Sequence, residues 1–181
     1  MTYSSSLPVG VVIARHKVES PWQDYAWRPE AVIAGAPADA GWRELAHGEG
    51  WVQFLAGTVT LELHRKETEA YKYNLECQQP MLYVVLTPDD DPDSPWPVRV
   101  LTVTASPFEA QNYLDSGEEI VEAVAIPEAI HRWLADFVDE HHVEEEFRKR
   151  KPDRVKVEDH KFGQEPLHEL RRRMAEQDND G

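Results

Sequence analysis

Apolar and polar residues alternate along most of the first two thirds of the chain, which is the pattern of half-buried β-strands. In residues 58–64, for example, Val59, Leu61 and Leu63 share one side, while the positions between them are polar. Gly57, just before this stretch, predicts a bend or bulge within a longer strand. The expected strands are residues 8–18, 30–34, 42–46, 51–56, 58–64, 69–75, 80–87, 98–104 and 119–126.

Two stretches instead have the spacing and end signals of helices. Ser106 is a favoured N-cap, Pro107 takes the first helical position, and Glu109 completes a capping box. A longer helix is expected to begin at Pro127 and to dock on the sheet, because its apolar residues recur three and four positions apart. These residues are Ile130, Trp133, Leu134, Phe137 and Val138. Residues 144–151 can extend this helix into solvent, and Pro152 is expected to end it.

Together these elements predict an α+β fold of mostly antiparallel strands, in one β-rich domain over residues 8–151 that ends in the long helix. The charged residues 152–181 are expected to form a partly disordered tail. About seven short strands separated by turn signals favour a small barrel or a strongly bent sheet, capped by the C-terminal helix. This order of elements is similar to that of pleckstrin-homology domains, a likeness that does not determine function.

The charge distribution argues against nucleic acid and membrane surfaces as partners. The 181 residues have a formal net charge of −15, and residues 1–143 carry 23 acidic and 9 basic side chains. An acidic body of this kind repels polyanions. Residues 144–181 are dense in charge but nearly neutral, which favours an arm that docks on a protein or a solubilising tail. No apolar run has membrane-spanning length and no secretion signal opens the chain, so a cytoplasmic protein is expected.

The absence of several sequence motifs excludes further kinds of binding site and catalytic site. Cys77 is the single cysteine, so an internal disulfide and a zinc site of several thiolates are both excluded. The sequence has no glycine-rich phosphate loop, dinucleotide fingerprint or nucleophile elbow. The acidic loop at residues 88–97 lacks the central glycine of calcium-binding loops. No catalytic residue and no cofactor are assigned; enzymatic activity stays open, and a non-catalytic role is favoured.

The aromatic segment 22–29 is the first candidate binding surface. Trp22, Trp27 and Arg28 fall in a stretch that is expected to form a loop. Exposed tryptophans with an arginine beside them can form a rigid recognition surface. The alternative is a plug at one end of the barrel, in which both indole rings are buried and Arg28 pairs with a carboxylate.

A second candidate has the densest mixture of donors and acceptors in the expected ordered part of the chain. Its members are His64, Arg65, Lys66, Glu67 and Tyr71. The two basic side chains can clamp an anion, and the imidazole can shuttle a proton. A charged stretch between two expected strands is also an ordinary hairpin turn in solvent, and a contact with a protein partner is a third interpretation.

The third candidate is a metal site near the end of the long helix. His142 and Glu146 lie four residues apart, so one helical turn brings them together, and His141 lies beside them. Imidazole and carboxylate groups at this spacing can share a divalent ion. The alternative is an exposed helix face, since the sequence nominates no further ligand.

Three stretches of the chain resemble a bacterial family of uncharacterised domains. They are PVGVVIARHKVESPWQDYAWRPEAVIAG, GTVTLELHRKETEAYKYNL and VTASPFEAQNYLDSGEEIVEAVAIPEAIHRWLADFVDEHHVEEEFRKRK, and the resemblance covers residues 8–151. Genes of this family are often found beside those for molybdenum-dependent formate dehydrogenase and its accessory proteins. The resemblance implies a role in assembly, maturation or cofactor loading of such an enzyme, and it assigns no catalytic residue.

Some relatives carry a label for molybdopterin guanine dinucleotide synthesis, but this chain lacks the glycine-rich nucleotide-binding start of those nucleotidyltransferases. The favoured hypothesis is therefore a non-catalytic accessory protein that binds a formate dehydrogenase subunit or maturation factor. One alternative is a small-ligand or cofactor-handling protein of the molybdenum cofactor pathway, with His64, Arg65 and Lys66 holding a pterin phosphate. Another is a metal-binding sensor that uses His141, His142 and Glu146.

Overall fold

The computed structural model describes residues 4–38, 41–143 and 172. The chain divides into two units, Met1–Val143 and Glu144–Gly181. All the strands and long helices described below belong to the first unit. The expected helix extension over 144–151 lies outside the described residues, as does the expected tail over 152–181 except for Arg172.

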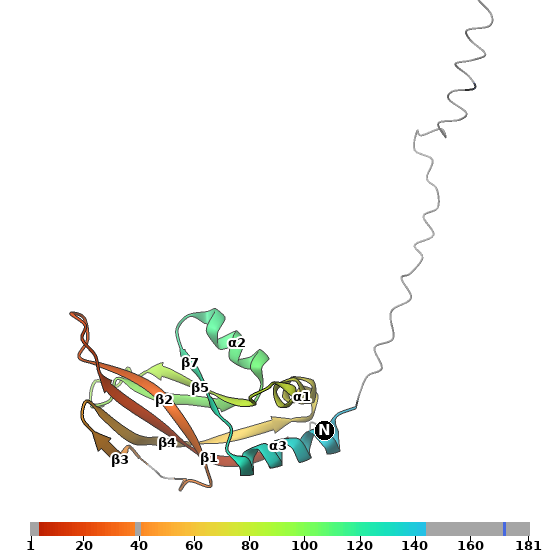
Figure 1. The fold of residues 1–181 in the computed structure, drawn as a ribbon, viewed down its shortest axis with the longest axis horizontal. Coiled ribbons are helices and arrows are strands. Elements are labelled where there is room, and N and C mark those ends of the chain that lie inside the picture. The colour runs from red at the N-terminus through yellow and green to blue at the C-terminus, as the bar shows by residue number, and fades with distance from the viewer. Residues whose placement is uncertain (1–3, 39–40, 144–171, 173–181) are drawn as a thin grey trace, which may run out of the picture. The chain divides into compact units, whose positions relative to one another are not determined.

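Four long antiparallel strands form the larger sheet (Figure 1). They lie in the order β2-β1-β4-β3, so β1 and β4 are central and β2 and β3 are edges. Their bounds are β1 Ser4–Lys17, β2 Tyr25–Ala34, β3 Arg43–Gly48 and β4 Trp51–His64. The register between β1 and β4 shifts between Val11 and Val12, where the partner changes from Gly57 to Leu55. This bulge confirms the irregularity that the sequence predicts at Gly57.

Three strands form the second antiparallel sheet, and short helices follow the strands of both sheets. β5 Met81–Pro88 lies between β6 Val98–Thr104 and β7 Ile120–Ala125. The helical elements are η1 Arg65–Glu67, α1 Thr68–Glu76, α2 Pro107–Ser116 and α3 Glu128–His141. The predicted class is confirmed: the fold is mostly antiparallel β with seven strands and a C-terminal helix. The strands form two sheets and no closed barrel among the described residues.

One hydrophobic core joins both sheets and α3. On α3, Ile130 and Leu134 are fully buried and Phe137 and Val138 nearly so, as the three-four spacing predicts. Trp133 is half-buried, and its indole Nε1–H donates a hydrogen bond of 3.2 Å to Ser5 Oγ at the start of β1. The helix therefore ties the end of the described domain to its beginning.

The ends of α2 follow the capping signals in the sequence. Ser106 Oγ accepts a hydrogen bond of 3.2 Å from the Glu109 N–H, and Pro107 opens the helix. Gly117 ends it with a φ of 72°, a left-handed conformation that glycine adopts at little cost. This local chemistry fixes where the connection from β6 to β7 turns.

The prediction of a strand over residues 69–75 is wrong, because this stretch forms most of helix α1. Alternating Tyr71, Tyr73 and Leu75 gave a strand pattern, but the buried residues of the helix include Ala70, Tyr71 and Asn74 at helical spacing. The position of the polar Asn74 in the folded protein, where it is buried, thus overrides the strand propensity of the local sequence.

The segment 25–29 was expected to be a loop and is instead the first half of β2. Pro29 is buried in this strand opposite Ile13, beside a register shift between Val12 and Ile13. Because β2 is an edge strand with a bulge at this point, the missing N–H of proline is tolerated. Trp27 and Arg28 are therefore strand residues that point to opposite faces.

Candidate functional site

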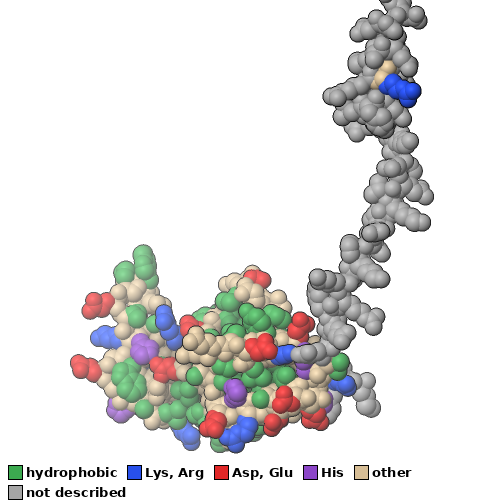
Figure 2. Space-filling model, turned by 45° about the vertical axis from the view of Figure 1, so that its right-hand side comes forward, with side chains coloured by type: hydrophobic (Ala, Val, Ile, Leu, Met, Phe, Trp, Pro, Cys, Tyr) green, Lys and Arg blue, Asp and Glu red, His purple; other side chains and the backbone are tan. Residues whose placement is uncertain are grey.

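The hairpin between β1 and β2 projects from the body of the larger sheet (Figure 1). It is closed at its base by a hydrogen bond of 3.0 Å from the Val18 N–H to the Asp24 carbonyl. Trp22 lies in the loop with 91% of its surface exposed. Its own N–H donates to Ser20 Oγ at 3.2 Å, which orders the turn around it. Hydrophobic side chains are visible at the tip of this hairpin (Figure 2). A buried plug is thus wrong for Trp22.

Trp27 lies apart from Trp22, in an aromatic cluster at one end of the core. We define this aromatic cluster as Trp27, Trp42, Phe54 and Trp96. The Trp42 and Trp96 rings stack with centroids 4.4 Å apart and planes 9° from parallel. Trp27 stacks on Phe54 at 5.9 Å. Trp96 belongs to the acidic loop between β5 and β6, so the cluster fastens that loop to the larger sheet. Trp27 is half-buried, and Arg28 is exposed on the other face of β2.

A cation–aromatic pocket is lined by residues of β1, of the start of β2 and of the connection from β3 to β4. It has a volume of about 200 Å³ and is lined by Arg15, Lys17, Tyr25, Gly48, Gly50, Trp51 and Val52. The Arg15 guanidinium carbon lies 4.5 Å from the Tyr25 ring centroid and 5.7 Å from that of Trp27. None of the residues that line this pocket is among the site residues predicted from the sequence. Its signal is the alternation of Ile13, Arg15 and Lys17, which places two cations on the face that carries a buried isoleucine.

The second predicted cluster is divided between the core and the surface. Tyr71 is buried, and its hydroxyl accepts a hydrogen bond of 3.1 Å from the backbone N–H of His64. Burial raises the pKa of the Tyr71 phenol to about 12, and the nearby Glu67 carboxylate adds to the rise. Arg65 and Lys66 are exposed on η1, so the expected hairpin turn is instead the short helix that leads into α1.

The His64 ring belongs to the surface of β4 and its Nε2 lies 3.3 Å from Glu62 Oε2. The donor to the Tyr71 hydroxyl is the backbone N–H of His64 and not its ring. The structure thus brings Glu67 and Tyr71 together, while Arg65 and Lys66 are exposed on η1.

The two histidines of the predicted metal site end α3 close to the start of α1. His142 Nδ1 lies 3.1 Å from Thr68 Oγ1, and the His141 ring packs on Phe137 with centroids 4.6 Å apart. The third member, Glu146, lies outside the described residues. Within 4–38, 41–143 and 172, no group of three or more His, Cys, Asp or Glu side chains is arranged to hold a metal ion.

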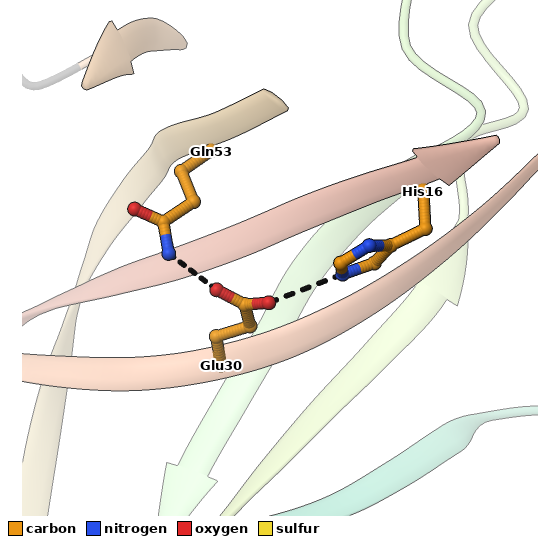
Figure 3. A network of polar contacts seen from close by, with 3 residues as sticks. All are labelled: His16, Glu30 and Gln53. Atoms are coloured by element: carbon orange, nitrogen blue, oxygen red, sulfur yellow. Dashed lines mark hydrogen bonds and ion pairs between the residues drawn. The ribbon is translucent and has the colours of Figure 1, made fainter. Parts of the chain in front are cut away.

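A polar network crosses the face of the larger sheet that is opposite the pocket's Arg15 (Figure 3). Glu30 Oε1 lies 3.1 Å from His16 Nε2, and Glu30 Oε2 accepts a hydrogen bond from Gln53 Nε2. Glu30 is the extra residue at the β2 bulge, because Pro29 pairs with Ile13 while Ala31 pairs with Val12. The network therefore joins three strands at an irregular position, which is a stabilising role.

A second exposed aromatic pair lies on the two short helices. Tyr73 on α1 and Phe108 on α2 have ring centroids 5.9 Å apart, and they are 56% and 54% exposed. This pair is far in sequence from the projecting hairpin and belongs to different elements. It provides a matched aromatic surface against which the contribution of Trp22 can be measured.

No helix in the described ranges combines the length and the apolar character that a bilayer crossing requires. Searches of curated proteins and of solved structures give no match to this chain. A family model does match, over residues 8–151, and its description is a protein of unknown function.

Proposed function

The chain belongs to that family, DUF3305, and we propose that it is a non-catalytic accessory protein that binds another protein through its projecting hairpin. The observation that carries the proposal is the 91% exposure of Trp22 at the hairpin loop. A large apolar side chain held in solvent by an ordered turn contributes little to folding. Tryptophan is also among the residues that most often dominate protein interfaces.

The surroundings of the hairpin support a protein as the partner. Trp22 offers a flat apolar ring with one N–H donor, and Tyr25, 41% exposed, begins β2 three residues later. Aromatic side chains of this kind supply contact area at a low cost in conformational entropy. Truncation of one such anchor commonly costs about 2–4 kcal/mol of binding free energy.

The resemblance to domains encoded beside molybdenum-dependent formate dehydrogenase makes a subunit or maturation factor of that enzyme the first partner to test. In this proposal the protein assists assembly or maturation by holding its partner. The excess of acidic side chains, with a formal net charge of −15, favours a partner that presents a basic rim around an apolar site.

Co-purification tests the proposal. The full chain, Trp22→Ser and Phe108→Ser are expressed with an affinity tag in cells that make the molybdoenzyme, and formate dehydrogenase components are quantified in each eluate. Wild type and Phe108→Ser are expected to retain the components. The amount recovered with Trp22→Ser is expected to be at least tenfold lower. Equal recovery with Trp22→Ser and wild type would reject the hairpin as the binding surface.

A thermal-shift screen with pterin and nucleotide ligands discriminates the ligand-handling alternative. The proposal expects no saturable shift in the melting temperature. A shift that Arg65→Ala abolishes would instead favour a small-ligand function at η1, and binding through the hairpin would then not be the main activity.

A further inference from the structure

The cation–aromatic pocket has the features of a site for a carboxylate. The Arg15 guanidinium carbon lies over the Tyr25 ring, 4.5 Å from its centroid, and 5.7 Å from the ring centroids of Trp27 and Phe54. Contact with several aromatic rings restricts the movement of a guanidinium group and can leave its N–H edges available to a ligand. A planar fork held in this way matches a carboxylate, which can accept two parallel hydrogen bonds from it.

The two cations of the pocket have no counter-ion among the residues that the structure describes. Within the described parts of the chain, neither the Arg15 nor the Lys17 side chain takes part in an ion pair or a hydrogen bond. The body is rich in carboxylates, with 34 acidic against 19 basic side chains in the whole chain. Two neighbouring cations that remain unpaired on such a protein therefore form a local positive site that an external anion can neutralise.

The walls of the pocket are fixed by glycines in the β3–β4 turn. A Cβ on Gly48 would overlap the indole of Trp51, so the ring rests directly on this glycine. Gly50 has a φ of 77°, and its carbonyl accepts a hydrogen bond of 2.8 Å from the Lys17 N–H. The turn is thereby held against the end of β1, and the pocket is preformed rather than assembled by the ligand.

The size of the pocket limits what it can hold. Its volume is about 200 Å³. Sites for whole small molecules usually have about 300–1,000 Å³. The pocket thus suits a side-chain-sized group better than a pterin or a dinucleotide.

We propose that the cation–aromatic pocket receives the carboxylate of an Asp or Glu side chain presented by the bound protein partner. This inference rests on the proposed function. Tyr25 and Trp22 are three residues apart, which limits the distance between their Cα atoms to ~10 Å. One partner segment can therefore bury the Trp22 ring and place a carboxylate against Arg15. The aromatic contact supplies affinity, and the charged contact fixes the register of the segment.

Direct binding of small anions tests the pocket without the partner. ¹⁵N-labelled full chain is titrated separately with benzoate, acetate and phosphate, and the Trp51 indole and Arg15 Nε–H signals are followed by NMR. Benzoate carries a carboxylate on a ring and is expected to give saturable shifts at millimolar concentrations, with acetate weaker. Tighter binding of phosphate than of benzoate would overturn the assignment to a carboxylate.

Substitutions locate the site. Arg15→Gln and Lys17→Gln are expected to weaken benzoate binding about tenfold and severalfold, and Arg43→Gln, an exposed arginine on β3 outside the pocket, is expected to leave it unchanged. Arg15 also packs on aromatic rings, so Lys17, which is exposed, serves as the variant that folds without loss. Unchanged binding in both pocket variants would overturn the proposal.

The two proposals fail in different ways. Trp22→Ser is expected to leave benzoate binding intact while it abolishes capture of the partner. If partner capture depends on Trp22 but is unaffected by Lys17→Gln and by added benzoate, the carboxylate proposal is wrong and the hairpin proposal stands. If benzoate binds in the pocket but no partner is captured, the hairpin proposal is wrong, and the pocket is left as a site for a free carboxylate.

Discussion

The side chain of Asn74 and the backbone of Met81 form hydrogen bonds in both directions. Asn74 Nδ2 donates to the Met81 carbonyl at 2.7 Å, and the Met81 N–H donates to Asn74 Oδ1 at 3.1 Å. The same amide group also donates to the carbonyl of Ala105 at 2.9 Å. One buried asparagine therefore holds α1 to the beginning of β5 and to the end of β6.

Replacing Asn74 is expected to destabilise the fold strongly. Asn74→Ala leaves buried backbone groups at Met81 and Ala105 without partners, and the expected cost is about 2–4 kcal/mol of unfolding free energy. Urea denaturation measures it, with Asn112→Ala on the exposed face of α2 as the matched control. A loss in Asn74→Ala no greater than in the control would contradict the bridging role.

The buried phenol of Tyr71 predicts an alkaline loss of stability. Its pKa is raised to about 12 by burial, whereas the unfolded side chain ionises near 10.0. Below pH 10 both states are protonated, and this group contributes no pH dependence. Between about pH 10 and pH 12 the unfolded chain loses a proton that the folded chain retains, so the free energy of unfolding falls by roughly 1–2 kcal/mol.

Tyr71→Phe tests this expectation. The variant loses the hydrogen bond with the His64 N–H and is expected to be less stable at pH 8. Its stability should then fall less steeply than that of wild type between pH 10 and pH 12, as measured by denaturation at a series of pH values. Parallel curves for the two proteins would show that the phenol ionises normally in the folded state.

The two tryptophan environments predict effects of different size on the stability of the fold. Trp96→Ala removes a ring that stacks on Trp42 at 4.4 Å and is expected to cost about 2–4 kcal/mol. Trp22→Ala removes an exposed ring and is expected to change stability by less than about 0.5 kcal/mol. Thermal and urea unfolding of the two variants check this. A large loss in Trp22→Ala would mean that the hairpin is part of the folding core.

Periodicity alone was sufficient for the elements in which local pattern and burial agree. On α3, Ile130 and Leu134 recur four residues apart and are both fully buried, so the helix could be predicted together with the face it buries. The N-cap at Ser106 was predictable for the same reason, since the capping interaction involves residues only three apart.

Elements that depend on distant partners could not be predicted. Helix α1 is held by Asn74 contacts with backbone groups 7 and 31 residues away, and both lie outside the stretch 69–75 whose pattern predicts a strand. The first half of β2 contains Pro29, which signals a break in the sequence and is tolerated only because of the edge position and the bulge.

In the candidate site, too, some features follow from the local sequence and others depend on contacts between distant residues. Trp22 and Trp27 could be singled out as aromatic residues in a polar stretch, but their different environments depend on where β2 begins. The cation–aromatic pocket requires the register that places Arg15 opposite Trp27 and Lys17 opposite Tyr25, together with the glycine turn of another hairpin. Because this register is a property of the assembled sheet, the alternation of Arg15 and Lys17 in the sequence does not by itself indicate which aromatic rings lie beside them.

Photo-crosslinking at the hairpin tests the central claim most directly. Trp22 is replaced by the photo-reactive amino acid benzoylphenylalanine in the full chain, and Phe108 is replaced in the same way in a matched control; both variants are irradiated in cells that make the molybdoenzyme. Binding through the hairpin predicts covalent adducts with a formate dehydrogenase subunit or maturation factor from position 22 and at least tenfold fewer from position 108. Adducts formed equally from both positions, or only from position 108, would contradict it.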